Sequence, residues 1–242
     1  MYGLYLEGDE IVQIMISVVA ISFALAIVFA GADGMMGYPR EFLLFMAPLF
    51  VTVGSGFILH EMAHKLVAIY YGAQAKFRMW TQGLLLMLAT SFWGVLFAAP
   101  GAVYIYSDKI TRRQNGLISI AGPALNVGLM AIFLALEFFA PVRQFYSFLL
   151  VPGADFSPFG MGGGILSVWH FGAAMNIMLA LFNMIPAFPL DGSKVYAWNR
   201  FIWIGVVVAL LSLGAVVISP GIVVGWGIML LIFSLLSKVL FG

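Results

Sequence analysis

The sequence predicts an all-α polytopic membrane protein with six transmembrane helices and a re-entrant, β-type segment between the second and the third. Composition is the first observation behind this fold class. Of 242 residues, 63% are hydrophobic and only 9% are charged, whereas a soluble domain usually carries about 25% charged residues. The second observation is that apolar runs of roughly 20 residues, the length that crosses a bilayer, recur along the chain.

Five stretches are long and apolar enough to cross the membrane as helices. They cover residues 11–31, 42–70, 117–140, 165–189 and 201–219. A sixth stretch, residues 221–241, follows a turn signal at Ser219, Pro220 and Gly221. Neither an internal repeat nor a Ser/Pro-rich linker divides the chain, so we expect a single membrane-embedded domain over residues 1–242.

The stretch from Gly83 to Gly101 is apolar but short for a crossing, and it contains Gly94 and Pro100. Residues 75–80, AKFRMW, precede it and alternate between apolar and polar, which is typical of a strand. Irregular backbone at membrane depth is tolerated where protein or water covers it. These features favour a segment that enters the membrane and returns to the same side.

The distribution of Lys and Arg supports this re-entrant interpretation. If residues 83–101 return and the N-terminus is cytoplasmic, nine of the 11 Lys and Arg residues are cytoplasmic, and only Arg40 and Arg143 lie outside. If residues 83–101 cross while the group at 65–78 stays inside, four lie inside and seven outside. We therefore expect a multi-pass protein of the cell membrane with both termini cytoplasmic.

Charge and cysteine content exclude several function classes. The net charge is +1 and there is no long basic run, so nothing indicates nucleic-acid binding. The chain has no Cys, which excludes disulfides and thiolate metal sites. The first ten residues contain no Lys or Arg, so they lack the basic start of a cleaved signal peptide.

The sequence HEMAH lies inside the apolar run 42–70. His60 and His64 are four residues apart and share one face of a helix, with Glu61 beside the first. Ionisable groups at membrane depth are costly and usually functional. In the HExxH arrangement two imidazoles hold zinc and the glutamate takes a proton from the metal-bound water. The other interpretation, hydrogen-bonded packing histidines, leaves the buried Glu61 without a role.

A catalytic zinc takes three protein ligands and keeps one open position. With no Cys, His170 and Asp191 are the candidates for the third ligand, but they lie 21 residues apart. At 1.5 Å per residue this is roughly 30 Å of helix, so the two belong to opposite leaflets. Asp191 shares the cytoplasmic leaflet with the two histidines if residues 83–101 are re-entrant. We expect Asp191 to be the ligand, rather than a loop carboxylate paired with Lys194, and His170 to be an interface anchor.

Two asparagines are expected at the depth of the zinc site. Asn183 precedes Asp191 by eight residues, and Asn126 lies about nine residues into the run 117–140. Either could donate a hydrogen bond to the oxyanion that forms when water attacks a peptide carbonyl. The alternative is that they join helices by hydrogen bonds, as polar residues often do in membranes. Asn176 could do either.

Together these motifs resemble the site-2 protease family of intramembrane zinc metalloproteases, of the archaeal and bacterial type without PDZ or CBS domains. The matching sequences are HEMAH at 60–64, PGAVYIY at 100–106, AGPALN at 121–126 and NMIPAFPLDG at 183–192. The resemblance covers about residues 45–195, the catalytic core of the family, and leaves 11–31, 201–219 and 221–241 as flanking helices. It implies one zinc ion per chain held by His60, His64 and Asp191. It also implies that Glu61 is the general base and that Asn183 and Asn126 are the motif asparagines.

The sequence therefore predicts an intramembrane zinc metalloprotease that cleaves peptide bonds within or at the edge of transmembrane segments of other proteins, as in regulated intramembrane proteolysis. Its partners would be such substrates and the lipid bilayer, with the active site in the cytoplasmic leaflet. An extended substrate could pair with a strand such as 75–80. The alternatives are a CAAX-type membrane protease, which would need Glu137 as its third ligand, and a metal transporter with a His/Asp transit site.

Overall fold

The structure is a computed structural model that describes residues 6–96, 100–107, 109–139 and 167–241. Most of these residues are helical, and four of the described helices are long and apolar enough to cross a membrane. These are Gly8–Gly37 (α1), Pro39–Tyr70, Arg112–Phe139 (α5) and Arg200–Val217 (α8). The structure thus agrees with a helical, multi-pass membrane protein. Arg143 lies outside the described residues.

The helix that carries HEMAH changes its winding just before the motif. It consists of α2 (Pro39–Leu49), a π-helical turn (Phe50–Gly54) and α3 (Ser55–Tyr70). Such π turns loosen the regular hydrogen-bond ladder and are frequent at functional sites. Polar side chains satisfy the carbonyl groups here. The hydroxyl of Thr52 donates to the carbonyl of Pro48 at 2.7 Å, and the Asn176 amide donates to the carbonyl of Thr52 at 3.4 Å.

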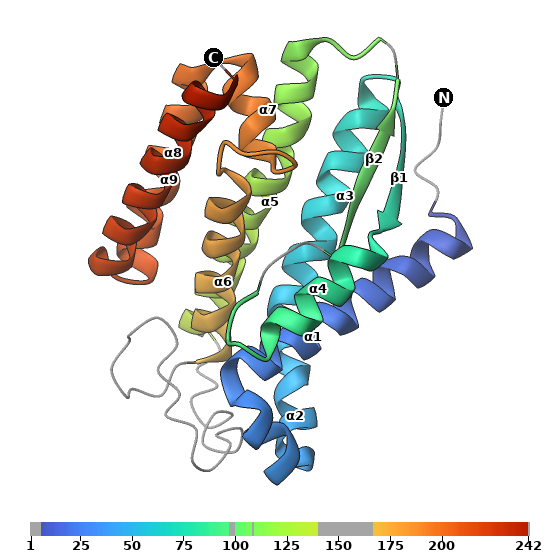
Figure 1. The fold of residues 1–242 in the computed structure, drawn as a ribbon, viewed down its shortest axis with the longest axis vertical. Coiled ribbons are helices and arrows are strands. Elements are labelled where there is room, and N and C mark those ends of the chain that lie inside the picture. The colour runs from blue at the N-terminus through green and yellow to red at the C-terminus, as the bar shows by residue number, and fades with distance from the viewer. Residues whose placement is uncertain (1–5, 97–99, 108, 140–166, 242) are drawn as a thin grey trace.

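Two short strands form a hairpin beside α3, as Figure 1 shows. Strand β1 (Gln74–Met79) pairs antiparallel with β2 (Gly101–Tyr106), and Met79 lies opposite Gly101. The strand-like alternation at 75–80 therefore corresponds to β1. Between the strands, the short helix α4 (Thr81–Ser91) packs against α1. Because Met79 and Gly101 are paired, the two ends of the intervening segment lie together.

Side chains of α1 cover the outer edge of β1. The buried carboxylate of Glu10 accepts a hydrogen bond from the backbone N–H of Phe77 at 2.8 Å, and the Gln13 side chain accepts one from Met79 at 2.9 Å. Glu10 also forms a buried ion pair with Lys65 of α3 at 2.5 Å. The backbone groups on this edge of β1 are therefore already engaged, which leaves the opposite edge of the hairpin, on β2, facing α3.

Helix α5 packs between α3 and α6 (Val168–Asn183) and forms the centre of the molecule (Figure 1). A loop then leads to α7 (Asp191–Trp198), followed by α8 and its neighbour α9 (Pro220–Phe241). α6 has 16 residues, fewer than the run 165–189 suggested, and residues 165–166 lie outside the described part. It ends at Asn183 because the following prolines lack the backbone N–H that a helix needs.

Candidate active site

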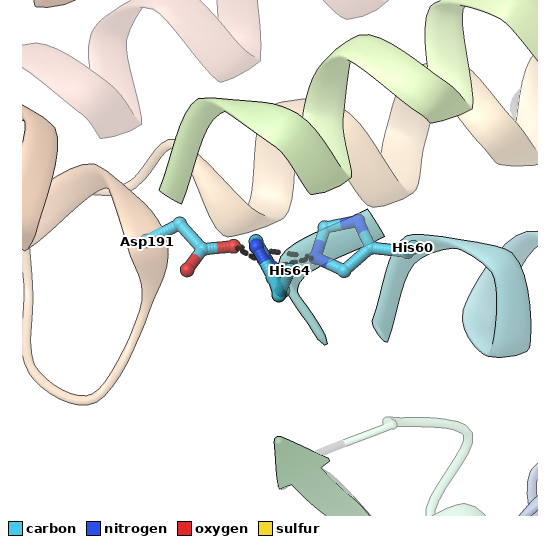
Figure 2. Close-up of side chains that lie close together, drawn as sticks. All are labelled: His60, His64 and Asp191. Atoms are coloured by element: carbon cyan, nitrogen blue, oxygen red, sulfur yellow. Dashed lines mark hydrogen bonds and ion pairs between the residues drawn. The ribbon is translucent and has the colours of Figure 1, made fainter. Parts of the chain in front are cut away.

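His60, His64 and Asp191 converge at one buried point, although α3 and α7 are far apart in the sequence. The Nε2 atoms of the two imidazoles lie 3.0 Å apart. The Oδ2 atom of Asp191 lies 2.9 Å from Nε2 of His64 and 3.2 Å from that of His60, as Figure 2 shows. Two ligands of one tetrahedral zinc lie about 3.3 Å apart, since each is about 2.0–2.1 Å from the metal. The three distances among Nε2 of His60, Nε2 of His64 and Oδ2 of Asp191 are close to this value.

Hydrogen bonds on the far side of each imidazole determine which nitrogen carries the proton. Nδ1 of His60 lies 2.6 Å from Oδ1 of Asn126, and Nδ1 of His64 lies 2.7 Å from the carbonyl oxygen of Ile118. Both oxygens are acceptors, so each Nδ1 donates, and the Nε2 atoms of the neutral rings carry lone pairs. Two lone pairs and a carboxylate oxygen therefore face one another, an arrangement that a metal cation satisfies and that metal-binding histidines commonly show.

Asn126 is completely buried, and its amide orientation is fixed by its neighbours. Its Nδ2 atom donates to the carbonyl of Gly56 at 3.2 Å and to Oδ1 of Asn176 at 2.9 Å. Both amide hydrogens are therefore engaged, and Oδ1 is left to accept from His60. Asn176 in turn donates to the carbonyl of Gly172 at 2.8 Å. The geometry favours an orienting role for Asn126 over donation to a substrate oxyanion.

Gly122 of α5 provides the space beside the two imidazoles. A Cβ atom at this position would lie 2.5 Å from Nε2 of His60 and 2.6 Å from Nε2 of His64. Any larger residue would therefore fill the place where a metal must approach both nitrogens. Sequence reasoning did not single out Gly122. The only signal was its membership of the AGPALN sequence.

The loop before α7 brings Asp191 to the histidines. A Cβ at Gly192 would lie 2.2 Å from the carbonyl oxygen of Met184, so glycine is required for α7 to start this close to the end of α6. The indole N–H of Trp203 donates to the same carbonyl at 2.8 Å. Lys194 lies 3.3 Å from Oδ1 of Asp191.

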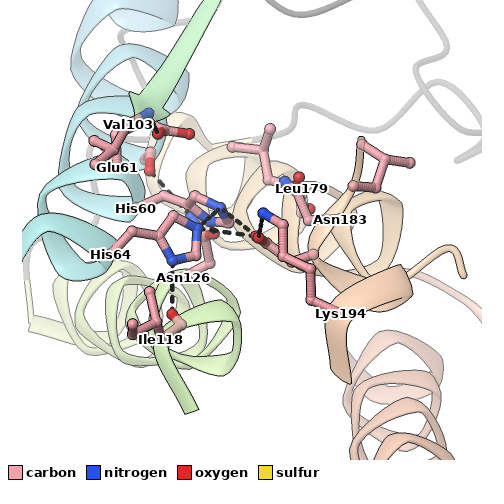
Figure 3. Close-up of polar contacts among 12 residues, drawn as sticks. His60, Glu61, His64, Val103, Ile118, Asn126, Leu179, Asn183 and Lys194 are labelled. Carbon is pink, nitrogen blue, oxygen red and sulfur yellow. Dashed lines mark hydrogen bonds and ion pairs between the residues drawn. The ribbon is translucent and has the colours of Figure 1, made fainter. Parts of the chain in front are cut away.

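Glu61 is buried beside His60 and is held by the hairpin. Its Oε2 atom accepts a hydrogen bond from the backbone N–H of Val103 in β2 at 2.7 Å, as Figure 3 shows. Lys65, one turn further along α3, pairs with Glu10. The sequence offered no partner for Glu61, because a backbone group supplied by a distant strand leaves no trace in residue types.

The remaining candidates lie around this centre. Asn183 is partly buried at the end of α6 and donates to the carbonyl of Leu179 at 3.0 Å. With His60 and Glu61 it lines a cavity of about 280 Å³, whose other walls are mainly apolar residues of α1, α6, α9 and the start of β2. His170 lies in the first turn of α6, at the end opposite Asn183, and is not part of the buried cluster.

Comparison with known proteins agrees with this chemistry. Residues 48–204 match the model of peptidase family M50. Over 80% of the chain and 86% of the relative, the sequence is 40% identical to the zinc metalloprotease MJ0611 of Methanocaldococcus jannaschii. It is 31% identical to YwhC of Bacillus subtilis over 67% of the chain and 72% of that protein. It is 27% identical to MJ0392 of M. jannaschii over 63% of the chain and 34% of that protein.

No solved structure matches the chain. The family match covers more than half of the sequence, and it contains both histidines, the glutamate between them and Asp191. Each of the three relatives is named as a zinc metalloprotease. The chain therefore belongs to peptidase family M50, the site-2 protease family, and is a membrane zinc metalloprotease.

Proposed function

We propose that this protein hydrolyses peptide bonds within or at the edge of the transmembrane segments of other membrane proteins, as in regulated intramembrane proteolysis. One observation carries the proposal. The buried group formed by His60, His64 and Asp191 adjoins a mainly apolar cavity of about 280 Å³, lined largely by helices of a membrane protein. An apolar peptide would find its most favourable surroundings in that cavity.

His60, His64 and Asp191 are the residues that would hold the zinc ion. When bound, zinc would supply an acidified water and polarise the scissile carbonyl. Glu61 accepts the proton of the attacking water at its carboxylate and passes it to the leaving amine. Asn183, in the wall of the same cavity, donates to the oxygen on which negative charge develops. Asn126 keeps the His60 ring in position.

The substrate would bind as an extended chain along β2. A helical peptide keeps its carbonyls hydrogen-bonded, so the bond to be cut must first be unwound. The edge of β1, which contains most of the stretch 75–80, is covered by Glu10 and Gln13 of α1. The opposite edge lies on β2, whose residue Val103 directs its N–H toward Glu61. Addition of a strand to this edge would bring a peptide to the general base.

For the topology we propose six crossings, two of them made by α6 and α9, and a segment 83–101 that returns to its own side. The pairing of Met79 with Gly101 supports the return, because it joins the two ends of the segment. Ion pairs also join the start of α1 to β1, through Glu7 with Lys76 at 2.5 Å and Asp9 with Arg78 at 3.0 Å. These contacts support one common side for the N-terminus and the hairpin. From the distribution of Lys and Arg we propose that this side is cytoplasmic, with the active site in the adjacent leaflet.

The alternatives receive no support from the geometry. A CAAX-type protease would place Glu137 beside the two histidines, but Glu137 bonds to Ser167 at the start of α6. A transporter would give Glu61 no function at its position one residue from a metal ligand. We propose that the whole chain is a single catalytic domain.

The test is cleavage of single-span substrates by protein purified in detergent. Wild-type protein should cleave them, and either a zinc chelator or Glu61→Gln should abolish cleavage. Added zinc should restore the chelated sample but not the variant. His170→Ala serves as the matched control and should keep full activity. Cleavage that survives chelation, or persists in Glu61→Gln, would refute a zinc-dependent mechanism.

A further inference from the structure

A second cavity adjoins the far end of β2 and differs in character from the first. Its volume is about 550 Å³, and it lies between the end of β2, the start of α5 and α7. Its polar lining includes Ser107, Arg112, Asn115, Ser193 and Lys194. No carboxylate occurs among the described residues that line it. The described lining therefore presents two cations and several neutral hydrogen-bonding groups.

Strand β2 connects the two cavities and passes Glu61 on the way. Gly101 lines the apolar cavity, and Ile105 lines the polar one. Val103, midway between them, directs its N–H to Glu61. Alternate residues of a strand share an edge, and four residues of strand span about 13 Å. A peptide lying along this edge would reach both cavities, with its scissile bond near Val103.

One of the two cations that line the polar cavity is available to bind an anion. Arg112 is exposed and forms no ion pair with a carboxylate of the described residues. Lys194 is already close to Asp191, at 3.3 Å, so it is less available. A guanidinium group binds a carboxylate through two parallel hydrogen bonds, and such charge-assisted bonds are the stronger ones. Arg112 is thus the main anchor that this cavity offers to an anion.

We propose that the polar cavity binds an acidic side chain of the substrate, two or three residues from the scissile bond on its aqueous side. This proposal rests on the protease function proposed above and adds a substrate class to it. The preferred substrate is a membrane-boundary segment whose apolar residues occupy the first cavity and whose Asp or Glu reaches Arg112. Complementary charges of this kind contribute specificity more than overall affinity.

The experiment compares three substrates that differ at one position. A single-span substrate carries Asp, Asn or Lys at the second or third residue on the aqueous side of its cleavage site. Wild-type protein should cleave the Asp form with the highest kcat/KM. Arg112→Gln should lower kcat/KM for the Asp form by about tenfold, the loss of one charge-assisted bond, and leave the Asn form unchanged. Arg112→Glu should prefer the Lys form.

Arg113→Gln is the matched control, because Arg113 is also exposed but does not line the cavity. It should behave as wild type. Equal kcat/KM for the Asp and Asn forms in the wild type, or an equal loss for all forms in Arg112→Gln, would overturn the proposal. So would an equal effect of the two arginine variants. Zinc content should be the same in every variant.

A binding measurement tests the acidic-residue site independently of the proposed protease function. The inactive Glu61→Gln variant is titrated with the same three segments, labelled with a fluorophore. Tighter binding of the Asp form, lost with Arg112→Gln in the same background, supports the acidic-residue site even if the wild type cleaves nothing. Equal binding of all three forms would overturn the site whether or not cleavage occurs.

Discussion

Asn126→Ala tests how the buried amide supports the metal centre. The substitution removes the acceptor for Nδ1 of His60 at 2.6 Å and the donor to Oδ1 of Asn176 at 2.9 Å. It also removes a donor to the carbonyl of Gly56 at 3.2 Å. The imidazole then loses the contact that fixes both its rotation and its tautomer. Metal binding should weaken without any change to the three ligands themselves.

The expected magnitude follows from these contacts. Loss of a hydrogen-bond partner of a metal-bound histidine typically weakens metal binding by about 10–100-fold, which corresponds to about 1.4–2.7 kcal/mol. Of the three groups that lose a contact, Gly56 lies within helix α3, whereas Nδ1 of His60 and Oδ1 of Asn176 are buried side-chain atoms that have Asn126 as their partner. Each unsatisfied buried group costs about 1–3 kcal/mol, so folding stability should fall by about 2–6 kcal/mol.

Zinc affinity is measured in detergent by competition with a coloured chelator, and stability by thermal unfolding with and without zinc. Asn183→Ala is the matched control, because among the described residues that amide donates to the helix carbonyl of Leu179 and not to the histidines. It should keep wild-type zinc affinity and lose activity. If Asn126→Ala binds zinc within about twofold of wild type yet is inactive, the orienting role is wrong and Asn126 acts on the substrate.

Three further substitutions, two of them with a control variant, test other contacts of the site. Gly122→Ala should bind no zinc, because its new Cβ would lie 2.5–2.6 Å from both Nε2 atoms; full zinc content, measured by metal analysis, would contradict this. Val103→Pro removes the N–H that holds Glu61 at 2.7 Å and should lower kcat about tenfold with zinc retained, whereas Val103→Ala keeps the N–H and should be nearly normal. Asp191→Ala should lower zinc occupancy and His170→Ala should not, so unchanged zinc in the first would mean that the third ligand is another residue.

Sequence reasoning reached the parts of the site that depend on spacing along one helix or on membrane sidedness. His60 and His64 share a helix face by their four-residue interval, and the structure places their Nε2 atoms 3.0 Å apart. The prediction that Asp191 is the third ligand depended also on residues 83–101 returning to their own side of the membrane. In the structure its carboxylate lies beside both rings. Local periodicity likewise predicted the strand near 75–80.

Other features depend on how closely distant elements approach, which residue types do not reveal. Gly122 matters because α5 passes directly against the imidazoles of His60 and His64. A glycine in the sequence does not reveal which side chains it contacts. Val103 contributes a backbone N–H, which every residue except proline has. The length of α6 was overestimated because apolar residues continue through the loop after Asn183, although the prolines there end the helix.

The buried ion pair of Glu10 and Lys65 links the helix that carries the two histidines to the strands that hold Glu61. Lys65 follows a metal-ligand candidate directly, and an unpaired charge buried there would be costly. Glu10 pairs with it at 2.5 Å and also accepts the N–H of Phe77, which lies opposite Val103 in the hairpin. A single carboxylate of α1 thus joins α3 to β1, and β1 carries the strand that holds Glu61. The position of Glu61, the proposed general base, therefore depends on α1, a helix that contributes no residue to the metal group.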